Sequence, residues 1–234
     1  DCGMHSFTVR LPADIAEEDL LQEIEHLNQR ADVDGFIVQL PLPSHISVQR
    51  VTEAIRPSKD VDCFHPENVG LLALGRPRFL PATPGGILTL LRYYGIPVEG
   101  RHVVVVGRSH IVGLPLSLLL AAPSPEGNAT VTLCHSRTQH LEEHTRRADI
   151  LVAALGRPAF IKARHVKPGV VVVDVGITRV PDPQSPNGYR LVGDVDHTEV
   201  APLCSAITPV PGGVGPMTIV TLLWNTIRAA GGND

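Results

Sequence analysis

The chain has 234 residues, of which 43% are hydrophobic and 4% aromatic, and its formal net charge is −4 at pH 7. That length allows one large domain or two modest ones, and the composition predicts an aliphatic core. The sequence holds no long basic block, which argues against nucleic acid as the main partner. It has no apolar run long enough to span a membrane, and its N-terminus resembles neither a signal nor a transit peptide, so no membrane partner is expected.

The first part of the chain alternates predicted strands and helices. Apolar spacing predicts a strand at residues 7–11, a helix at 16–28, a strand at 35–38 and a helix at 48–55. Asp14 is expected to cap the first helix. The second strand must end before Pro41, because proline cannot donate a ladder hydrogen bond.

A second unit is predicted from Pro84 onward. It comprises a helix at 87–94, a strand at 102–106, a helix at 111–120, strands at 130–133, 150–154 and 170–175 with helices between them, and a last helix at 217–230. Strands separated by helices imply right-handed crossovers and a parallel sheet of Rossmann type. The fold class is therefore α/β, and the last helix is expected to return to the first part of the chain.

A glycine-containing turn follows the predicted strand at 102–106. Gly107 and Gly113 enclose Arg108 and Ser109 where a strand gives way to a helix, a place where a dinucleotide pyrophosphate can rest on a helix N-terminus. The spacing is G-x5-G rather than G-x-G-x-x-G. As a glycine pattern alone, it also fits an ordinary strand-to-helix turn.

The end of the next strand bears on the choice of cofactor. NAD-binding folds place an acid there to hold the ribose hydroxyls, but this chain has Ser136 and Arg137 instead. Hydroxyl and guanidinium groups suit a 2′-phosphate. The pattern favours NADP, with NAD less favoured.

Gln39 and Asp62 form a second candidate site. Gln39 follows an apolar strand, at the end where parallel sheets bind ligands. Asp62 lies in a polar loop, and an ordinary turn aspartate is the alternative for it. A third candidate is the segment 209–218, whose prolines and glycines fix a backbone shape that lets a ligand approach closely. The alternative for this segment is a plain linker.

Cysteine and histidine patterns predict no metal site. The four cysteines lie far apart and form no C-x-x-C pair, so free thiols in a reducing compartment are expected. His140 and His144 match the H-x-x-E-H pattern of some zinc peptidases. No third ligand accompanies them, and we interpret them as part of a charged helix surface.

Five segments in this order resemble a known family: G-F-I-V-Q-L-P-L-P at 35–43, K-D-V-D at 59–62, L-P-A-T-P at 80–84, G-R-S-H-I-V-G at 107–113 and P-G-G-V-G-P-M-T at 211–218. Together they are similar to the bifunctional methylenetetrahydrofolate dehydrogenase/cyclohydrolases, over nearly the whole chain. The resemblance implies two α/β domains with a cleft between them. Residues 1–83 and 209–234 would form the folate-binding catalytic domain, and residues 84–208 the NADP-binding domain.

The resemblance also implies roles for individual residues. Gln39 would tune a catalytic lysine and Asp62 would bind the pterin ring, with the folate site lined by Pro211, Gly212, Gly213, Val214 and Gly215. NADP would be held by Gly107, Arg108, Ser109, Ser136 and Arg137, with Ile177 near the nicotinamide. The reaction would be oxidation of methylenetetrahydrofolate to methenyltetrahydrofolate, followed by hydrolysis to formyltetrahydrofolate. The family implies a homodimer in the cytoplasm, with a mitochondrial location still open.

The chain departs from the family pattern in two places. The family carries a further N-terminal stretch with a tyrosine and a lysine one helical turn apart, and that lysine would fall just before Asp1. Cys63 stands where glycine is commoner. Two alternatives to the enzyme are weighed: a non-catalytic module that binds folate and NADP, which the first departure suggests, and an unrelated NADP-linked dehydrogenase of a small acid. Intact Gln39 and Asp62 argue against the second alternative.

Overall fold

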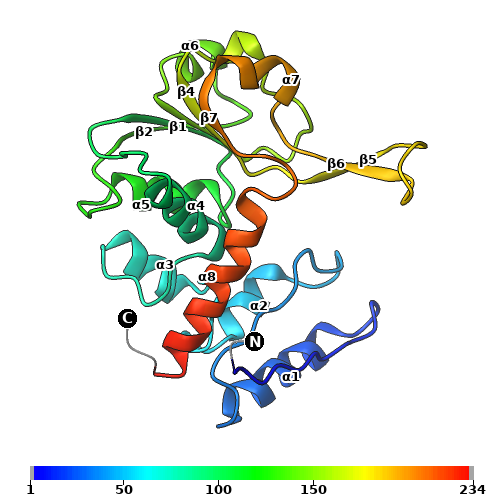
Figure 1. Ribbon diagram of the computed structural model, residues 1–234. Coiled ribbons are helices and arrows are strands. Elements are labelled where there is room, and N and C mark those ends of the chain that lie inside the picture. The colour runs from blue at the N-terminus through cyan, green and yellow to red at the C-terminus, as the bar shows by residue number, and fades with distance from the viewer. Residues whose placement is uncertain (1–2, 232–234) are drawn as a thin grey trace.

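A computed structural model describes residues 3–231, and Figure 1 shows their arrangement. The helices are α1 (Glu17–Gln29), α2 (Val48–Ala54), α3 (Pro66–Ala73), α4 (Ala82–Tyr93), α5 (Gly113–Ala121), α6 (Leu141–Thr145), α7 (His197–Val200) and α8 (Val214–Ala229), with short 3-10 helices at Ala163–His165 and Ala201–Leu203. The strands are β1 (His102–Val106), β2 (Thr130–Cys134), β3 (Ile150–Ala153), β4 (Val170–Asp174), β5 (Thr178–Pro181), β6 (Tyr189–Val192) and β7 (Cys204–Ile207). The α/β class is confirmed.

A five-stranded parallel sheet has the order β2-β1-β3-β4-β7. The strand β1, which lies between β2 and β3, is a run of valines after His102, and side chains on a strand alternate between the two faces. Val103 and Val105 pack with α4 and α5, whereas Val104 and Val106 pack on the opposite face. Burial on both faces explains why the strand reads as a continuous apolar run.

One expected connection differs from the structure, and one connection was not expected. Between β3 and β4 the chain forms only the 3-10 helix Ala163–His165, where a longer crossover helix was predicted. The strands β5 and β6 form an antiparallel hairpin that extends away from the body of the molecule (Figure 1). Sequence analysis identified neither this hairpin nor β7, because both depend on pairing rather than on a strong apolar period.

The predicted strands in the first part of the chain are wrong. Residues 7–11 form no ladder, and Phe7 is 54% exposed. The segment 35–38 contributes a single bridge, from Phe36 to Asp60. Both segments have strand-like periods, but a strand requires a neighbour to pair with, and residues 3–231 supply none beyond that bridge.

The predicted cap of the first helix is also wrong. Asp14 lies in a turn, and α1 begins later, with Ala16 at the N-cap and no side-chain cap. Glu17, Glu18 and Asp19 in the first turn complement the helix dipole instead. The predicted apolar face is present, since Leu20 and Ile24 pack with Val51 of α2.

Helix α8 joins the two parts of the molecule (Figure 1). It packs along α4, and Leu222 reaches the buried cluster of Val61 and Phe79. The amide nitrogen of Asn225 donates to the carbonyl oxygen of Val61 at 2.8 Å and to that of Leu80 at 2.7 Å. The expected return of the last helix is therefore confirmed. No helix among residues 3–231 is both long and apolar enough for a membrane crossing.

Candidate active site

The glycine loop (residues 107–113) folds tightly between β1 and α5. Gly107 has φ of +125°, and a Cβ there would lie 2.0 Å from the carbonyl oxygen of Ala154. A Cβ on Gly113 would lie 1.8 Å from the carbonyl oxygen of Gly107. Ser109 Oγ accepts a hydrogen bond from the N–H of Val112 at 3.1 Å. Only glycine fits at either position, and the loop presents its backbone at the start of α5, where a phosphate can bind.

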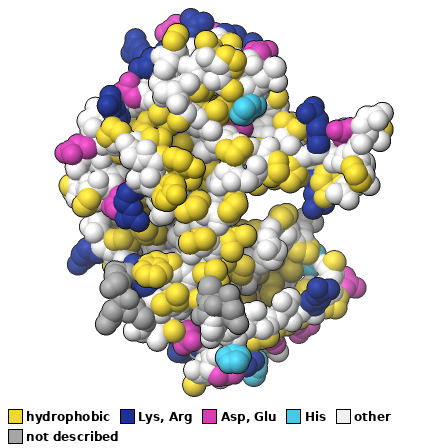
Figure 2. Space-filling view, viewed as in Figure 1, with side chains coloured by type: hydrophobic (Ala, Val, Ile, Leu, Met, Phe, Trp, Pro, Cys, Tyr) yellow, Lys and Arg dark blue, Asp and Glu magenta, His cyan; other side chains and the backbone are white. Residues whose placement is uncertain are grey.

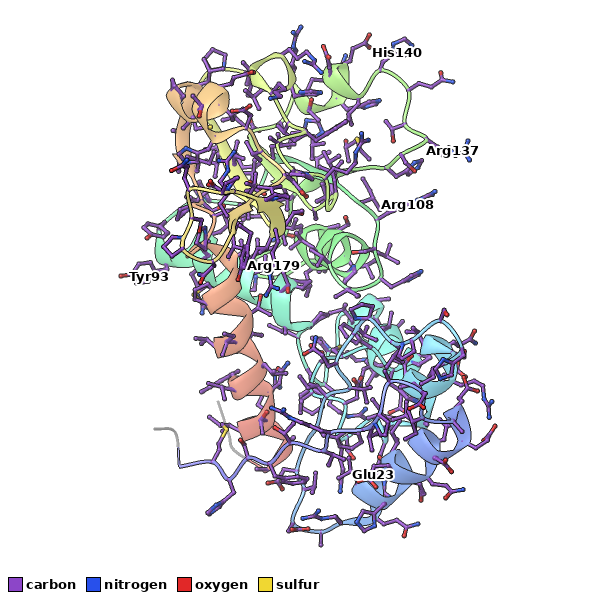
Figure 3. All side chains as sticks on the ribbon, turned by 90° about the vertical axis from the view of Figure 1, so that its right-hand side faces the viewer. Glu23, Tyr93, Arg108, Arg137, His140 and Arg179 are labelled. Carbon is purple, nitrogen blue, oxygen red and sulfur yellow. The ribbon has the colours of Figure 1, made fainter. Side chains whose placement is uncertain are left out.

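The loop after β2 lies beside the glycine loop. The N–H of His135 donates to Thr138 Oγ1 at 2.8 Å, and the N–H of Arg137 donates to His135 Nδ1 at 3.1 Å. These bonds leave Ser136 and Arg137 exposed at the carboxyl end of the strand. Arg108 and Arg137 extend outward on the same side of the molecule (Figure 3).

The proline–glycine loop (residues 208–216) follows β7 and includes the first three residues of α8, Val214 to Pro216. A Cβ on Gly213 would lie 2.5 Å from the carbonyl oxygen of Pro209, and Gly212 has φ of +99°. A Cβ on Gly215 would lie 3.6 Å from Cδ1 of Ile177, which is itself 53% exposed after β4. The loop therefore runs directly beside the residue expected at the nicotinamide end of the cofactor site.

Asp62 lies in a small apolar pocket. The pocket is lined by the residues on both sides of Gln39, by α2 with Ile55 at its end, and by the loop around Asp62. The lining residues are Phe36, Ile37, Val38, Leu40, Val48, Val51, Thr52, Ile55, Asp60 and Phe64. Burial, with a smaller contribution from the charge of Asp60, raises the pKa of Asp62 to about 6. Gln39 is exposed, does not line this pocket, and donates from Nε2 to the carbonyl oxygen of Leu40 at 2.9 Å. A carboxyl group in such a pocket can accept a ligand's N–H groups away from competing water.

Residues 1–62 match the family described as "Tetrahydrofolate dehydrogenase/cyclohydrolase, catalytic domain", and residues 81–233 match its "NAD(P)-binding domain". The chain belongs to this family. Among curated relatives, the "Bifunctional protein FolD" of Porphyromonas gingivalis is 56% identical over 232 residues, covering 99% of this chain and 78% of that protein. The protein of the same name from Cytophaga hutchinsonii is 57% identical over 228 residues, covering 97% and 79%.

Solved structures agree. The methylenetetrahydrofolate dehydrogenase-cyclohydrolase of Trypanosoma brucei, complexed with NADP and an inhibitor, has a TM-score of 0.91 and 43% identity, covering 97% of this chain and 77% of that chain. The bifunctional enzyme of Campylobacter jejuni has a TM-score of 0.86 and 47% identity, covering 94% and 74%. These comparisons confirm three predictions: the family, the dehydrogenase and cyclohydrolase activities, and NADP as the cofactor. No finding favours the non-catalytic alternative.

Cys63 shows why glycine is commoner at its position in this family. Its φ is +64°, in the left-handed region that glycine enters without steric cost. The side chain is nonetheless accommodated, because it is buried and its Sγ donates to the carbonyl oxygen of Phe79 at 3.3 Å. The turn therefore keeps the backbone shape that presents Asp62.

Asp60 is a site residue that sequence analysis missed. It is 1% exposed and accepts hydrogen bonds from the N–H of Phe64 at 3.2 Å, the N–H of His65 at 2.8 Å and Asn68 Nδ2 at 2.8 Å. Asn68 in turn accepts from Arg78 at 2.6 Å. The carboxylate thus fixes the turn behind Asp62. The sequence signal that could have identified Asp60 is its position two residues before Asp62, with the apolar Val61 between them.

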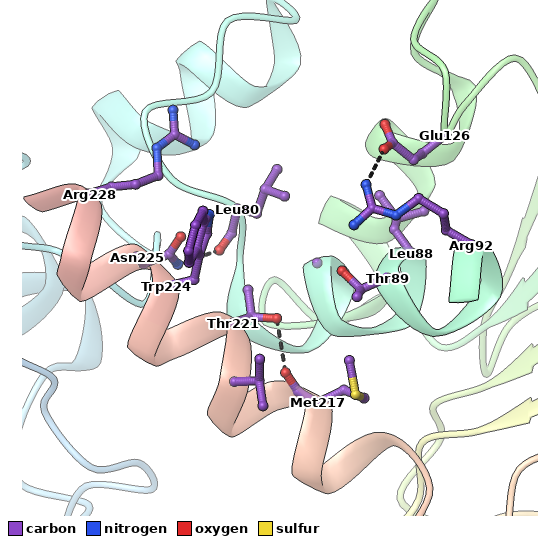
Figure 4. A pocket seen from close by; sticks show the side chains of 12 residues that line it. Leu80, Leu88, Thr89, Arg92, Glu126, Met217, Thr221, Trp224, Asn225 and Arg228 are labelled. Carbon is purple, nitrogen blue, oxygen red and sulfur yellow. Dashed lines mark hydrogen bonds and ion pairs between the residues drawn. The ribbon is translucent and has the colours of Figure 1, made fainter. Parts of the chain in front are cut away.

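The remaining candidates lie away from this site. His140 is exposed at the start of α6 and lies 3.9 Å from Glu143. Within residues 3–231, no group of three or more His, Cys, Asp or Glu side chains is placed to hold a metal ion. A separate groove between α4 and α8 contains Trp224, Arg92 and the buried Oδ1 of Asn225, which has no partner among the described residues (Figure 4). Of the sequence-predicted candidates, only Met217, at the end of the segment 209–218, is among the described residues that line that groove.

Proposed function

We propose that the site residues form two halves of one site, one half binding the folate and the other binding NADP. Asp62, Gln39 and Pro211–Gly215 hold the folate, and the loops after β1 and β2 hold NADP. The supporting observation is the proximity of Ile177 to Gly215, which brings the carboxyl edge of the parallel sheet to the proline–glycine loop. The surface is also hollowed between the β5–β6 hairpin and the part holding α1 and α2 (Figure 2).

The first reaction moves a hydride from the one-carbon bridge of methylenetetrahydrofolate to the nicotinamide, giving methenyltetrahydrofolate and NADPH. Water then adds to the methenyl carbon, a proton leaves and the ring opens to formyltetrahydrofolate. Asp62 accepts hydrogen bonds from two parallel N–H groups on the amino-pyrimidine edge of the pterin, since a carboxylate has two acceptor oxygens. Gln39 has the role of hydrogen-bonding and tuning the family's catalytic lysine. The folate domain comprises residues 1–83 and 209–234, and the NADP domain residues 84–208.

The cofactor end is set by four polar side chains. Ser109 and Ser136 offer hydroxyl groups, and Arg108 and Arg137 offer guanidinium groups, on two adjacent loops with no acid at the end of β2. An arginine can form a bidentate pair with a phosphate. The arrangement favours the 2′-phosphate of NADP over the free ribose hydroxyl of NAD.

Arg108→Ala is expected to weaken NADP binding about tenfold, because a charge-assisted hydrogen bond contributes about 1.5–3 kcal/mol. Affinity for NAD should change less than about twofold, since NAD lacks the 2′-phosphate. The measurement is titration of each variant with both dinucleotides. Arg101→Ala is the matched control, because Arg101 is exposed at the opposite end of β1. Equal losses for NADP and NAD would refute this role of Arg108.

We further propose a cytoplasmic homodimer. Cys63, Cys134 and Cys204 are free thiols, which suits a reducing compartment. The strand β7 lies at the sheet edge, so its outer hydrogen-bonding groups can pair with another copy. Beside it an apolar groove contains Leu90, Tyr94, Ile96, Ile207 and Pro209.

Tyr94→Glu is expected to convert the dimer to a monomer, because it places a charge in this groove while replacing a side chain that is 68% exposed. Light scattering after size-exclusion chromatography measures the mass. Leu74→Glu, at a residue that is 66% exposed after α3, is the control and should leave the dimer intact. A wild-type monomer, or a Tyr94→Glu dimer, would contradict the proposed surface.

A further inference from the structure

Two buried carboxyl groups lie at the carboxyl edge of the parallel sheet, outside the roles described above. Asp174 is the last residue of β4 and is 4% exposed; Asp194 follows β6 and is fully buried. Among the described residues, neither forms an ion pair with a cationic side chain. A buried carboxylate without a cation is costly unless hydrogen bonds satisfy it, so their partners indicate what they hold in place.

The carboxylate of Asp194 binds three consecutive backbone N–H groups. They belong to the turn after β3: Oδ2 accepts from Leu155 at 2.5 Å and Gly156 at 2.9 Å, and Oδ1 accepts from Arg157 at 2.8 Å. Three successive N–H groups around one anion form an anion-binding nest. Asp194 therefore fixes the turn that follows β3 from a position 37 to 39 residues away in sequence.

The carboxylate of Asp174 accepts hydrogen bonds from the segment that follows β4 and from the segment that follows β6. Oδ1 accepts from the N–H of Gly176 at 3.0 Å and from the N–H of Asp194 at 2.8 Å, while Oδ2 accepts from the N–H of Val195 at 3.0 Å. The N–H of Asp174 donates to Thr208 Oγ1 at 2.8 Å, at the start of the proline–glycine loop. The carboxylate of Asp174 is thus linked to the backbone of Asp194, and the backbone of Asp174 is linked to that loop.

Two glycines allow this close packing. A Cβ on Gly176 would lie 2.4 Å from Cγ of Asp194, and a Cβ on Gly193 would lie 1.9 Å from Oδ2 of Asp174. Gly176 immediately precedes Ile177, the residue beside Gly215. The hydrogen bonds of the two carboxylates therefore determine where Ile177 lies relative to the proline–glycine loop.

We propose that Asp174 and Asp194 are positioning residues for hydride transfer. They hold the Ile177 segment and the Leu155–Arg157 turn so that the nicotinamide meets the folate carbon, which rests on the proposed placement of the nicotinamide near Ile177. Hydride transfer depends on atoms held about 3–3.5 Å apart, and a misplacement of about 1 Å can cost about 10²-fold in rate. Burial raises the pKa of Asp174 to about 6, while the N–H groups of Val195, Asp194 and Gly176 favour the ionised form, which accepts hydrogen bonds only.

The test is Asp194→Asn, which keeps the side-chain shape but turns an amide NH2 toward one of the backbone N–H groups. Dehydrogenase kcat is expected to fall about 10- to 100-fold, because the cofactor is displaced. Hydrolysis of supplied methenyltetrahydrofolate needs no nicotinamide and should stay within about twofold. A deuterium isotope effect on the dehydrogenase step should increase, because hydride transfer becomes slower than the other steps.

Asp149→Asn is the matched control. Asp149 accepts from the N–H of His102 at 3.0 Å and from Lys167 at 2.7 Å, at the opposite edge of the sheet, so both activities should be unchanged. A proportional loss of both activities in Asp194→Asn would show a merely structural role, and full dehydrogenase turnover would also overturn the proposal. A wild-type chain without hydride transfer would instead refute the proposed function.

Asp174→Asn is a second variant, expected to show the same separation of the two activities. If neither variant folds, amide hydrogen exchange of the wild-type protein tests whether the two carboxylates hold these segments in place. The N–H groups of Gly156, Arg157 and Gly176 should then exchange as slowly as those of β1, because the carboxylates hold them. Rapid exchange at these three positions would overturn the proposal.

Discussion

Asp62→Asn is expected to lose at least about tenfold in folate affinity and, in the same variant, to gain stability at neutral pH. The loss follows because the amide keeps one acceptor oxygen but turns a donor toward the pterin N–H groups, removing a charge-assisted pair worth about 1.5–3 kcal/mol. Asp34→Asn, at an exposed residue just before the same segment, is the control. Folate titration measures the affinity, and an unchanged affinity would reduce Asp62 to a turn residue.

The gain in stability follows from the raised pKa of Asp62. Its pKa in the folded protein is about 6, against 3.8 for the ordinary side chain. The folded state therefore holds the proton more tightly, so the contribution of this group to stability is full below about pH 4 and is lost as the pH rises through 6. The shift corresponds to at most about 3 kcal/mol.

Measurements of the free energy of unfolding at several pH values test whether ionisation of Asp62 destabilises the folded protein. Asp62→Asn should have nearly the same stability as the wild type near pH 4 and should be the more stable protein above pH 6, because asparagine cannot ionise. Its NADP affinity should be unchanged, since Asp62 lies outside the glycine loop. A variant less stable than the wild type at pH 7 would show that the buried carboxylate has stabilising partners in the folded protein.

The parallel sheet could be predicted from sequence because its signals are local. Residues 103–106 are a run of valines ending at a glycine, and β1 comprises this run with His102 before it. The segments 7–11 and 35–38 have similar signals, but a strand also requires a partner, which no local pattern supplies. The last helix was predictable to within a few residues, since α8 begins at Val214 where Met217 was expected.

The candidate site divides in the same way. Gly107, Gly113 and the proline–glycine loop could be predicted, because their residue types report a backbone shape directly. Asp62 and Gln39 were candidates from their positions, but their individual roles depended on the family resemblance. Asp194 was not identifiable, because its carboxylate binds a turn 37 to 39 residues away and only the folded chain brings them together. The backbone of a site is therefore more readable from sequence than the buried side chains that hold it.

Gly113→Ala is expected to weaken NADP binding by at least about tenfold and to destabilise the fold. In a helix, alanine is favoured over glycine by about 1 kcal/mol, so propensity alone predicts a more stable protein. The added Cβ would instead lie 1.8 Å from the carbonyl oxygen of Gly107 and 3.2 Å from Cα of Arg108. Both neighbours are backbone atoms, so the glycine loop must shift, and with it the N–H groups that we propose to bind the pyrophosphate.

Gly70→Ala is the matched control for this prediction. Gly70 lies inside α3, and an added Cβ would meet no atom within 4 Å. That variant should gain about 0.5–1 kcal/mol and bind NADP as the wild type does. Chemical denaturation and NADP titration of both variants separate the steric effect from helix propensity. If Gly113→Ala were as stable as Gly70→Ala and bound NADP within about twofold of the wild type, the close approach of Gly113 to Gly107 would not govern cofactor binding.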